Sequence, residues 1–266
     1  MERGGGNFRA GNVCELAFLY IYFYNQIMKL LLTSNGLTTP ELEQAFSALI
    51  GGRKGLKMAL IPTAGDPIEW KPSAIEGGPL SDEYVAVTDP VQLENNMKWQ
   101  ESWRKEYENK GYSAYLVDLK DDPNLVKQQL SDADIINVSG GDGNYLMDWA
   151  KASKLDEYLK NLLDSGVVYL GTSAGSNLVT PSIGLGWWKP EETLDHKCLG
   201  IVDFCLAVHQ KEGDNRSGTQ KIIDYKKYLQ SVTDYPWKIY LVKDGQAIKV
   251  DGDKVEHIGP GEKKFL

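Results

Sequence analysis

The five residues from Gly171 to Gly175 constrain the fold more than any other stretch of the sequence. They read Gly-Thr-Ser-Ala-Gly and follow a β-branched and aromatic run, 165–170, that predicts a buried parallel strand. A short segment of helical character follows and stops at Pro181. Strand, Gly-x-Ser-x-Gly and helix together form a nucleophile elbow, in which the chain turns sharply and the serine backbone is strained. The alternative is a glycine-rich turn with an ordinary serine, and the flanking strand and helix favour the elbow.

An elbow at this position gives two residues a predicted chemical role. The two glycines lack a Cβ, so the strand and the helix can pass close to each other and hold the hydroxyl of Ser173 above the sheet edge. The following helix begins with N–H groups that have no partner inside the helix. The N–H of Ala174 is therefore the natural donor to an oxyanion that develops beside Ser173.

Strand and helix patterns alternate from Met28 onward. Such alternation predicts right-handed βαβ units, and therefore an α/β fold with a mostly parallel sheet and helices on both faces. The strands are predicted at 30–33, 56–62, 114–117, 135–138, 165–170 and 201–208, and the helices at 39–50, 89–109, 122–130, 145–163 and 219–230. Three further strands, at 239–242, 246–250 and 255–258, have turns between them at 243–245 and 251–253 and indicate a small antiparallel C-terminal meander.

Three segments do not follow this alternation in a simple way. Residues 1–27 have a glycine-rich start and an apolar run too short for a membrane span, so we expect an N-terminal extension outside a single α/β domain at 28–266. Residues 65–90 are too long for a simple connector and indicate a loop over the site or an insertion. The aromatic residues Trp99, Trp103 and Tyr107 recur at helical spacing, which favours core packing.

Composition excludes several classes of function. The net charge of −8 argues against a nucleic-acid partner. Three cysteines follow no disulfide or metal spacing, and three histidines cannot build a histidine-rich metal site, so no metal or cofactor is expected. The cysteine usage fits a reducing cytoplasm. The sequence predicts no stable membrane insertion, and it assigns no oligomeric state.

A serine nucleophile needs a base, and His209 is the predicted one. It ends an apolar strand and can face the elbow across the carboxyl edge of the sheet, where ligands of parallel sheets bind. His196 lies in a polar loop and His257 in the C-terminal meander, so both are poorer candidates. Cys205 lies among apolar residues on the strand before His209 and is interpreted as a core thiol.

The loop at residues 140–143 is predicted to supply the second oxyanion donor. It reads Gly-Gly-Asp-Gly at the end of a predicted strand, and backbone N–H groups without side chains can approach a substrate carbonyl there. Gly141 is the predicted donor. The alternative interpretation is that these glycines form a plain strand-to-helix turn. A competing interpretation takes the same tetrad as the phosphate loop of a nucleotide-binding kinase, but it leaves the elbow unexplained.

These residues together carry a resemblance to a known family. The stretches 138–142 and 169–178, and Asp203-Phe204 leading to His209, resemble the peptidase E (aspartyl dipeptidase) family of serine peptidases, and the similarity runs in order from Met28. The resemblance implies a class I glutamine-amidotransferase-like fold, a Ser-His-acid triad and an oxyanion hole from Gly141 and Ala174. It also implies a small peptide substrate with an acidic N-terminal residue, and no metal.

The sequence departs from that family pattern in two places. The family's aspartate position corresponds to Trp188. The nearby Glu191, Glu192 and Asp195 could each substitute, and Glu192 is the predicted triad acid. No arginine matches the one that reads an acidic side chain, and Arg216 is the nearest. Asp142, Trp188 and Arg216 are the predicted substrate-binding residues. A broken triad leaves a catalytically impaired binding module as the alternative function.

Overall fold

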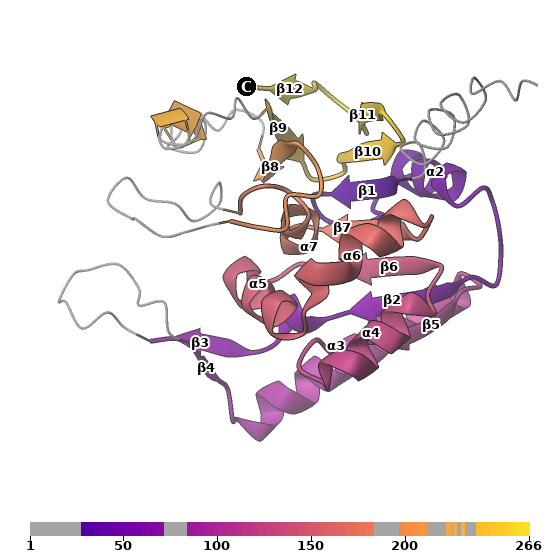
Figure 1. Ribbon diagram of the computed structural model, residues 1–266, viewed down its shortest axis with the longest axis vertical. Helices are drawn as coiled ribbons and strands as arrows, with labels where there is room; N and C mark the ends of the chain where they lie inside the picture. The colour runs from indigo at the N-terminus through magenta and orange to yellow at the C-terminus, as the bar shows by residue number, and fades with distance from the viewer. Residues whose placement is uncertain are drawn as a thin grey trace, which may run out of the picture.

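The computed structural model describes residues 28–71, 84–183, 197–211, 222–224, 226–227, 230–231 and 238–266. The predicted extension at 1–27 lies outside these residues and remains a prediction. Of the predicted helix at 219–230, residues 222–224, 226–227 and 230 are described, and they are helical. Within the described residues the chain forms a large mixed sheet, two smaller sheets and helices on either side of the large one (Figure 1).

The large sheet has seven strands in the order β11-β10-β1-β7-β6-β2-β5. Its parallel part comprises β1 (Lys29–Thr33), β7 (Val168–Thr172), β6 (Ile135–Val138), β2 (Lys57–Ile61) and β5 (Ser113–Leu116). On the β1 side, β10 (Ala247–Asp251) and β11 (Lys254–Ile258) continue the sheet with antiparallel pairing. The predicted α/β class is confirmed, and β7, the strand that leads to Ser173, lies inside the parallel part of the sheet.

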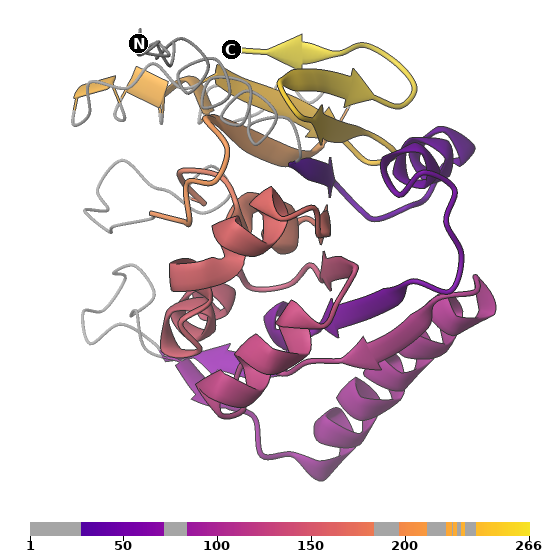
Figure 2. The ribbon, with the colours of Figure 1, turned by 45° about the vertical axis from the view of Figure 1, so that its right-hand side comes forward.

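Helices cover both faces of this sheet because its strands are apolar on both sides. Along β1, Leu30 and Leu32 face one buried cluster and Leu31 faces the other. The cluster around Leu31 includes side chains of α2 (Pro40–Leu49) and α3 (Pro90–Asn109). The other cluster includes α4 (Pro123–Ser131), α5 (Gly143–Ala152), α6 (Leu155–Asp164) and α7 (Ala174–Leu178). Figure 2 shows α2 and α3 separated from the red helices α5–α7 by the strands.

Three helices begin where the sequence predicts. Thr39, Asp89 and Asp122 each precede a proline, and each side chain accepts a hydrogen bond from a backbone N–H of the first helical turn. A proline at the first helical position costs no hydrogen bond, because its N–H would have no partner there. These local signals therefore fix the starts of α2, α3 and α4.

The predicted C-terminal meander is divided between two sheets. β9 (Lys238–Lys243) pairs in parallel with β8 (Phe204–Gln210) and antiparallel with β12 (Lys264–Phe265), whereas β10 and β11 belong to the large sheet. The turn from β9 to β10 thus passes from one sheet to the other. Because β8 and β9 are parallel, their carboxyl ends lie at the same edge, beside the end of β1.

The stretch at 65–90 contains regular structure on both sides of residues 72–83, which lie outside the described part. A short 3₁₀ helix, η1 (Thr63–Gly65), is followed by β3 (Ile68–Trp70), which pairs with β4 (Tyr84–Ala86) as a two-stranded ribbon. Figure 1 shows this ribbon beyond the left-hand ends of the parallel strands.

The aromatic stripe of α3 packs into the core at one end only. Tyr107 is buried and Trp103 packs against the cluster around it, but Trp99 is 39% exposed and stacks on Trp103 with ring centroids 5.7 Å apart. The predicted core packing therefore holds for the C-terminal part of the stripe. Trp99 instead lies against Gly65, the last residue of η1.

Candidate active site

Ser173 occupies a strained turn between β7 and α7. Its φ of 50° and ψ of −110° are unusual for a residue with a side chain. A Cβ at Gly171 would lie 2.7 Å from the Cα of Ser176, and a Cβ at Gly175 would lie 2.3 Å from the carbonyl oxygen of Val138. Only glycine fits at either position, so the backbone has the shape of a nucleophile elbow.

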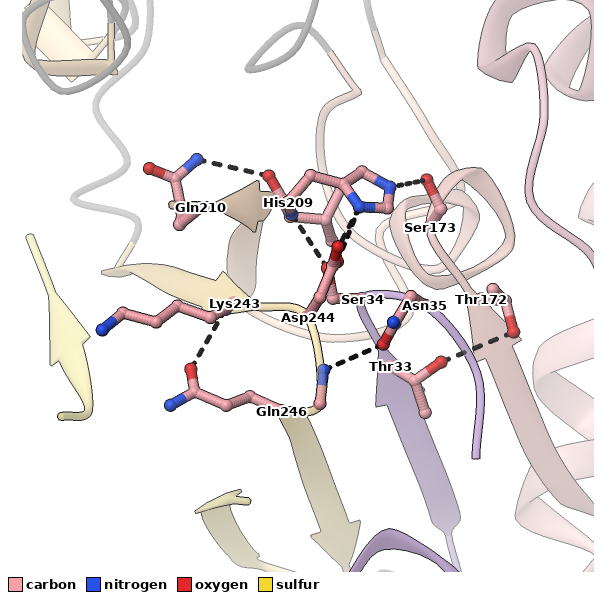
Figure 3. Close-up of polar contacts among 12 residues, drawn as sticks. Thr33, Ser34, Asn35, Thr172, Ser173, His209, Gln210, Lys243, Asp244 and Gln246 are labelled. Atoms are coloured by element: carbon pink, nitrogen blue, oxygen red, sulfur yellow. Dashed lines mark hydrogen bonds and ion pairs between the residues drawn. The ribbon is translucent and has the colours of Figure 1, made fainter. Parts of the chain in front are cut away.

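His209 lies directly against the hydroxyl of Ser173. The Oγ of Ser173 is 2.8 Å from Nε2 of His209, and Figure 3 shows the imidazole ring between Ser173 and Asp244. The pairing of β8 with β9 shifts register between Ala207 and Gln210, and His209 has a φ of 57° at this bulge. A bulge turns a side chain away from the regular alternation of the strand, and here it directs the imidazole toward the elbow.

Asp244 lies on the other side of the imidazole. Its Oδ1 is 2.8 Å from Nδ1 of His209, which is the contact that the acid of a Ser-His-acid triad makes. Glu192, the acid predicted from the sequence, lies outside the described residues. The carboxylate that contacts Nδ1 of His209 in the structure is that of Asp244. The sequence pattern predicts for Asp244 only a place in a turn. The signal that could have identified it is its place directly after an apolar strand, once that strand is taken as parallel to β8.

Two residues at the end of β1 hold the turn that carries Asp244. The Oγ of Ser34 donates to Oδ1 of Asp244 at 2.8 Å and accepts from the backbone N–H of His209 at 2.8 Å. The Oδ1 of Asn35 accepts from the backbone N–H of Gly245 at 2.9 Å. These contacts join β1, β8 and the β9–β10 turn at one point of the site (Figure 3).

The environment of Asp244 favours its ionised form. Partial burial acts to raise the pKa of Asp244, but hydrogen bonds from Ser34 and His209 and the charges of His209 and Lys211 outweigh it. The pKa of Asp244 therefore lies below its ordinary value. A negative carboxylate against Nδ1 stabilises positive charge on the imidazole, as a histidine base requires.

The loop after β6 supplies backbone N–H groups close to Ser173. A Cβ at Gly140 would lie 3.1 Å from the Cβ of Ser173, so the loop backbone touches the nucleophile. Gly141 has a φ of 143°, and a Cβ there would lie 1.8 Å from the carbonyl oxygen of Ala64. Within the described part of the chain, the N–H groups of Gly141 and Ala174 have no acceptor. In the described structure, the N–H groups of both predicted oxyanion donors are thus available to a bound ligand.

Asp142 holds this loop in place. Its backbone N–H donates to the carbonyl oxygen of Ala64 at 2.7 Å. Its Oδ1 accepts from the N–H of Tyr145 at 2.9 Å, and its Oδ2 accepts from Nε1 of Trp70 at 2.8 Å. With both oxygens engaged, these contacts favour an anchoring role over the predicted substrate-binding role. The other two predicted substrate-binding residues, Trp188 and Arg216, lie outside the described residues.

Two other candidates from the sequence, Cys205 and His257, do not share these contacts. Burial raises the pKa of the Cys205 thiol to about 12, so it carries no thiolate at neutral pH. Nε2 of His257 contacts Oε1 of Gln246 at 3.1 Å, and His196 lies outside the described residues. Among the residues that the structure describes, no group of three His, Cys, Asp or Glu side chains could hold a metal ion. None of the described helices combines the length and apolarity needed to cross a membrane.

Stability is expected to decrease between pH 6.5 and pH 4 because of His257. Burial, with the nearby charges of Lys263 and Lys238, lowers the pKa of His257 from 6.5 to about 4. The unfolded chain binds a proton at His257 in this interval and the folded protein does not, so the free energy of unfolding falls as the pH is lowered. After allowance for solvent screening we expect a loss on the order of 1–2 kcal/mol.

Urea unfolding at pH 7 and pH 4.5, with His257→Gln beside the unsubstituted protein, measures this effect. The variant is expected to lose less stability over the interval. Equal losses in the two proteins would show that another group is responsible.

Comparison with known proteins connects this arrangement to one family. The family model of peptidase family S51 matches residues 90–258. That range contains Ser173, His209 and Asp244, and it leaves out Ser34 and Ala64.

Individual relatives agree with the family match. An uncharacterized peptidase of Listeria innocua is 30% identical over 121 residues, which are 43% of this chain and 58% of that protein. Peptidase E of a Nostoc species is 25% identical over 181 residues, which are 66% of this chain and 70% of that protein. The matched region of the Listeria relative is thus little more than half its length. The crystal structure of a peptidase from an acI-B1 Actinobacterium superposes with a TM-score of 0.61 at 18% identity, over 92% of this chain and 96% of that one, which shows a shared fold.

Proposed function

The chain belongs to peptidase family S51, and from that premise we propose that it is a serine peptidase acting on short peptides through Ser173, His209 and Asp244. The observation that carries the proposal is the pair of contacts at His209. Nε2 faces the hydroxyl of Ser173 at 2.8 Å and Nδ1 faces the carboxylate of Asp244 at 2.8 Å. A base that contacts both a nucleophile and an orienting acid is what acyl transfer requires.

The first half of the reaction forms an acyl-enzyme. Nε2 of His209 takes the proton of Ser173 as its Oγ bonds to the carbonyl carbon of the scissile peptide bond, and the carbonyl oxygen becomes an oxyanion. The N–H groups of Gly141 and Ala174 donate to this oxyanion. As the intermediate collapses, the C–N bond breaks and His209 gives its proton to the leaving amine.

The second half releases the product. A water molecule enters in place of the amine, and His209 takes its proton as the oxygen bonds to the acyl carbon. The ester bond to Ser173 then breaks, and His209 returns the proton to Oγ. The negative charge on Asp244 stabilises the imidazolium in each half-reaction.

The two alternatives from the sequence receive less support than the peptidase. The impaired binding module depended on a missing acid, and Asp244 occupies that position. The nucleotide-binding kinase needed the Asp142 carboxylate for phosphoryl transfer, and both of its oxygens accept hydrogen bonds from the protein.

Labelling with a fluorophosphonate probe tests the proposal. We expect the probe to modify Ser173, because only an activated serine reacts readily with it. Ser173→Ala should abolish labelling without changing the thermal unfolding temperature. A folded protein that takes up no probe would contradict the proposed function.

The substrate side chain is tested separately with a panel of dipeptides that differ in their first residue. We propose short peptides as the substrate class, and the family resemblance adds a preference for an acidic first residue. Hydrolysis of the panel without a preference for aspartate would support the proposed peptidase activity and contradict the preference for an acidic first residue. We also propose a cytoplasmic location, since the three cysteines follow no disulfide spacing, as is usual in a reducing compartment.

A further inference from the structure

We propose that Ser34 is a positioning residue that fixes the orientation of Asp244 and, through Asp244, the proton on the His209 ring. This inference rests on the proposed function and deepens it, because it states how a carboxylate on a turn between two sheets is kept in register with the histidine.

Ser34 lies at a fixed point of the fold. It directly follows β1, which pairs with the elbow strand β7 on one side and with β10 on the other. The residue is fully buried, and its backbone N–H donates to the carbonyl oxygen of Gln246 at 3.1 Å. Asp244 by contrast stands on a turn, with 57% of its side chain exposed. The buried serine is therefore the rigid partner, and the exposed carboxylate is the group that needs to be held.

The hydroxyl of Ser34 has one proton, and its contacts determine where that proton goes. Among the described residues, three groups surround Oγ: the carboxylate of Asp244 at 2.8 Å, the backbone N–H of His209 at 2.8 Å, and Nδ1 of His209 at 3.4 Å. The carboxylate can only accept and the N–H can only donate. The hydroxyl of Ser34 consequently donates its proton to Asp244, and a lone pair on Oγ of Ser34 accepts the N–H of His209.

This assignment leaves Nδ1 of His209 facing acceptors only. Oδ1 of Asp244 is 2.8 Å away, and Oγ of Ser34 has no second proton to offer. Nδ1 therefore carries the ring proton of the neutral imidazole, and Nε2 presents a lone pair to Ser173. By holding Asp244 in this position, Ser34 thus maintains the tautomer in which His209 can act as a base.

Ser34 also supports the strained backbone at the bulge. His209 has a φ of 57°, a conformation that residues with side chains rarely adopt. Its N–H points to Oγ of Ser34 and receives a partner there. Without the hydroxyl this N–H would lose its partner, and one of the contacts that hold the imidazole over the elbow would be absent.

Ser34→Ala tests the proposal by steady-state kinetics on a hydrolysed dipeptide. We expect kcat to fall about 10- to 100-fold with little change in KM, because the lost hydrogen bond is to a charged group that acts in the transition state. Ser153→Ala is the matched control, since Ser153 is also buried and its hydroxyl bonds, within the part of the chain that the structure describes, only to the carbonyl oxygen of Ala150. An unchanged kcat in Ser34→Ala, or a loss equal to that of the control, would overturn the proposal.

Nitrogen-15 NMR of histidine-labelled protein gives a second readout that does not depend on activity, and its measurement on the unsubstituted protein needs no variant. At neutral pH the unsubstituted protein is expected to show His209 protonated at Nδ1, and Ser34→Ala is expected to show a mixture of tautomers. Protonation at Nε2 in the unsubstituted protein would refute the role of Ser34. Failure of the peptidase itself would instead appear as absence of probe labelling, whatever the NMR result.

Discussion

Replacing Asp244 by asparagine is expected to lower kcat about 10⁴-fold with little change in KM or in the unfolding temperature. An amide can donate to Nδ1 of His209, which moves the ring proton to Nε2 and removes the base that faces Ser173. It also removes the negative charge that stabilises the imidazolium. Stability should change little, because the Asp244 side chain is more than half exposed.

The matched control for this prediction is Glu192→Gln. The sequence alone places the acid at Glu192, whereas the contact to Nδ1 of His209 belongs to Asp244. We therefore expect Glu192→Gln to retain kcat within a few-fold. If Glu192→Gln inactivates the protein and Asp244→Asn does not, the triad acid is Glu192, as predicted from the sequence, and not Asp244.

Substituting alanine for Gly141 is expected to reduce kcat by about 10²- to 10³-fold, the usual effect of losing one oxyanion donor. A Cβ at this position would lie 1.8 Å from the carbonyl oxygen of Ala64, so the loop has to move away from η1. Its N–H then moves away from the oxyanion position beside Ser173. KM should change less than kcat, because this donor acts mainly on charge that develops in the transition state.

Two further variants separate loop displacement from general damage. Gly52→Ala introduces alanine at a glycine with a φ of 64° and open space around it, so it shares the backbone strain and lacks the clash. It should retain kcat at a small cost in stability. Trp70→Phe removes the donor to Oδ2 of Asp142 and keeps an aromatic ring, and should lower kcat about 2- to 10-fold. Equal losses of kcat in Gly141→Ala and Gly52→Ala would contradict the oxyanion role of Gly141.

The strained serine turn, the imidazole beside it and the adjacent glycine loop could be found from the sequence, because most of their signals are local. An elbow needs glycines two residues on either side of its serine, and Gly171 and Gly175 are visible in the sequence. The starts of α2, α3 and α4 are likewise encoded in neighbouring residues, a capping side chain followed by proline. His209 could be inferred because it ends an apolar strand in a fold where strand ends meet at one edge.

Asp244 and Ser34 could not be identified in this way. Short strands joined by tight turns predict antiparallel neighbours, which places residues 243–245 in an ordinary surface turn. In the structure β9 pairs in parallel with β8, a strand separated from it by 27 residues of sequence, and β10 pairs with β1. Strand partners so far apart are chosen by the packing of the whole sheet, and local sequence carries little information about them.

The sequence by itself determined the parallel architecture, the strained turn at Ser173 and the glycine loop beside it, because each follows from backbone preferences of adjacent residues. Only the tertiary structure decided which carboxylate orients His209 and which hydroxyl holds that carboxylate. Those contacts join Ser34, His209 and Asp244, which come from three separate strand ends. Their distances depend on how two sheets meet at one edge, which no local pattern encodes.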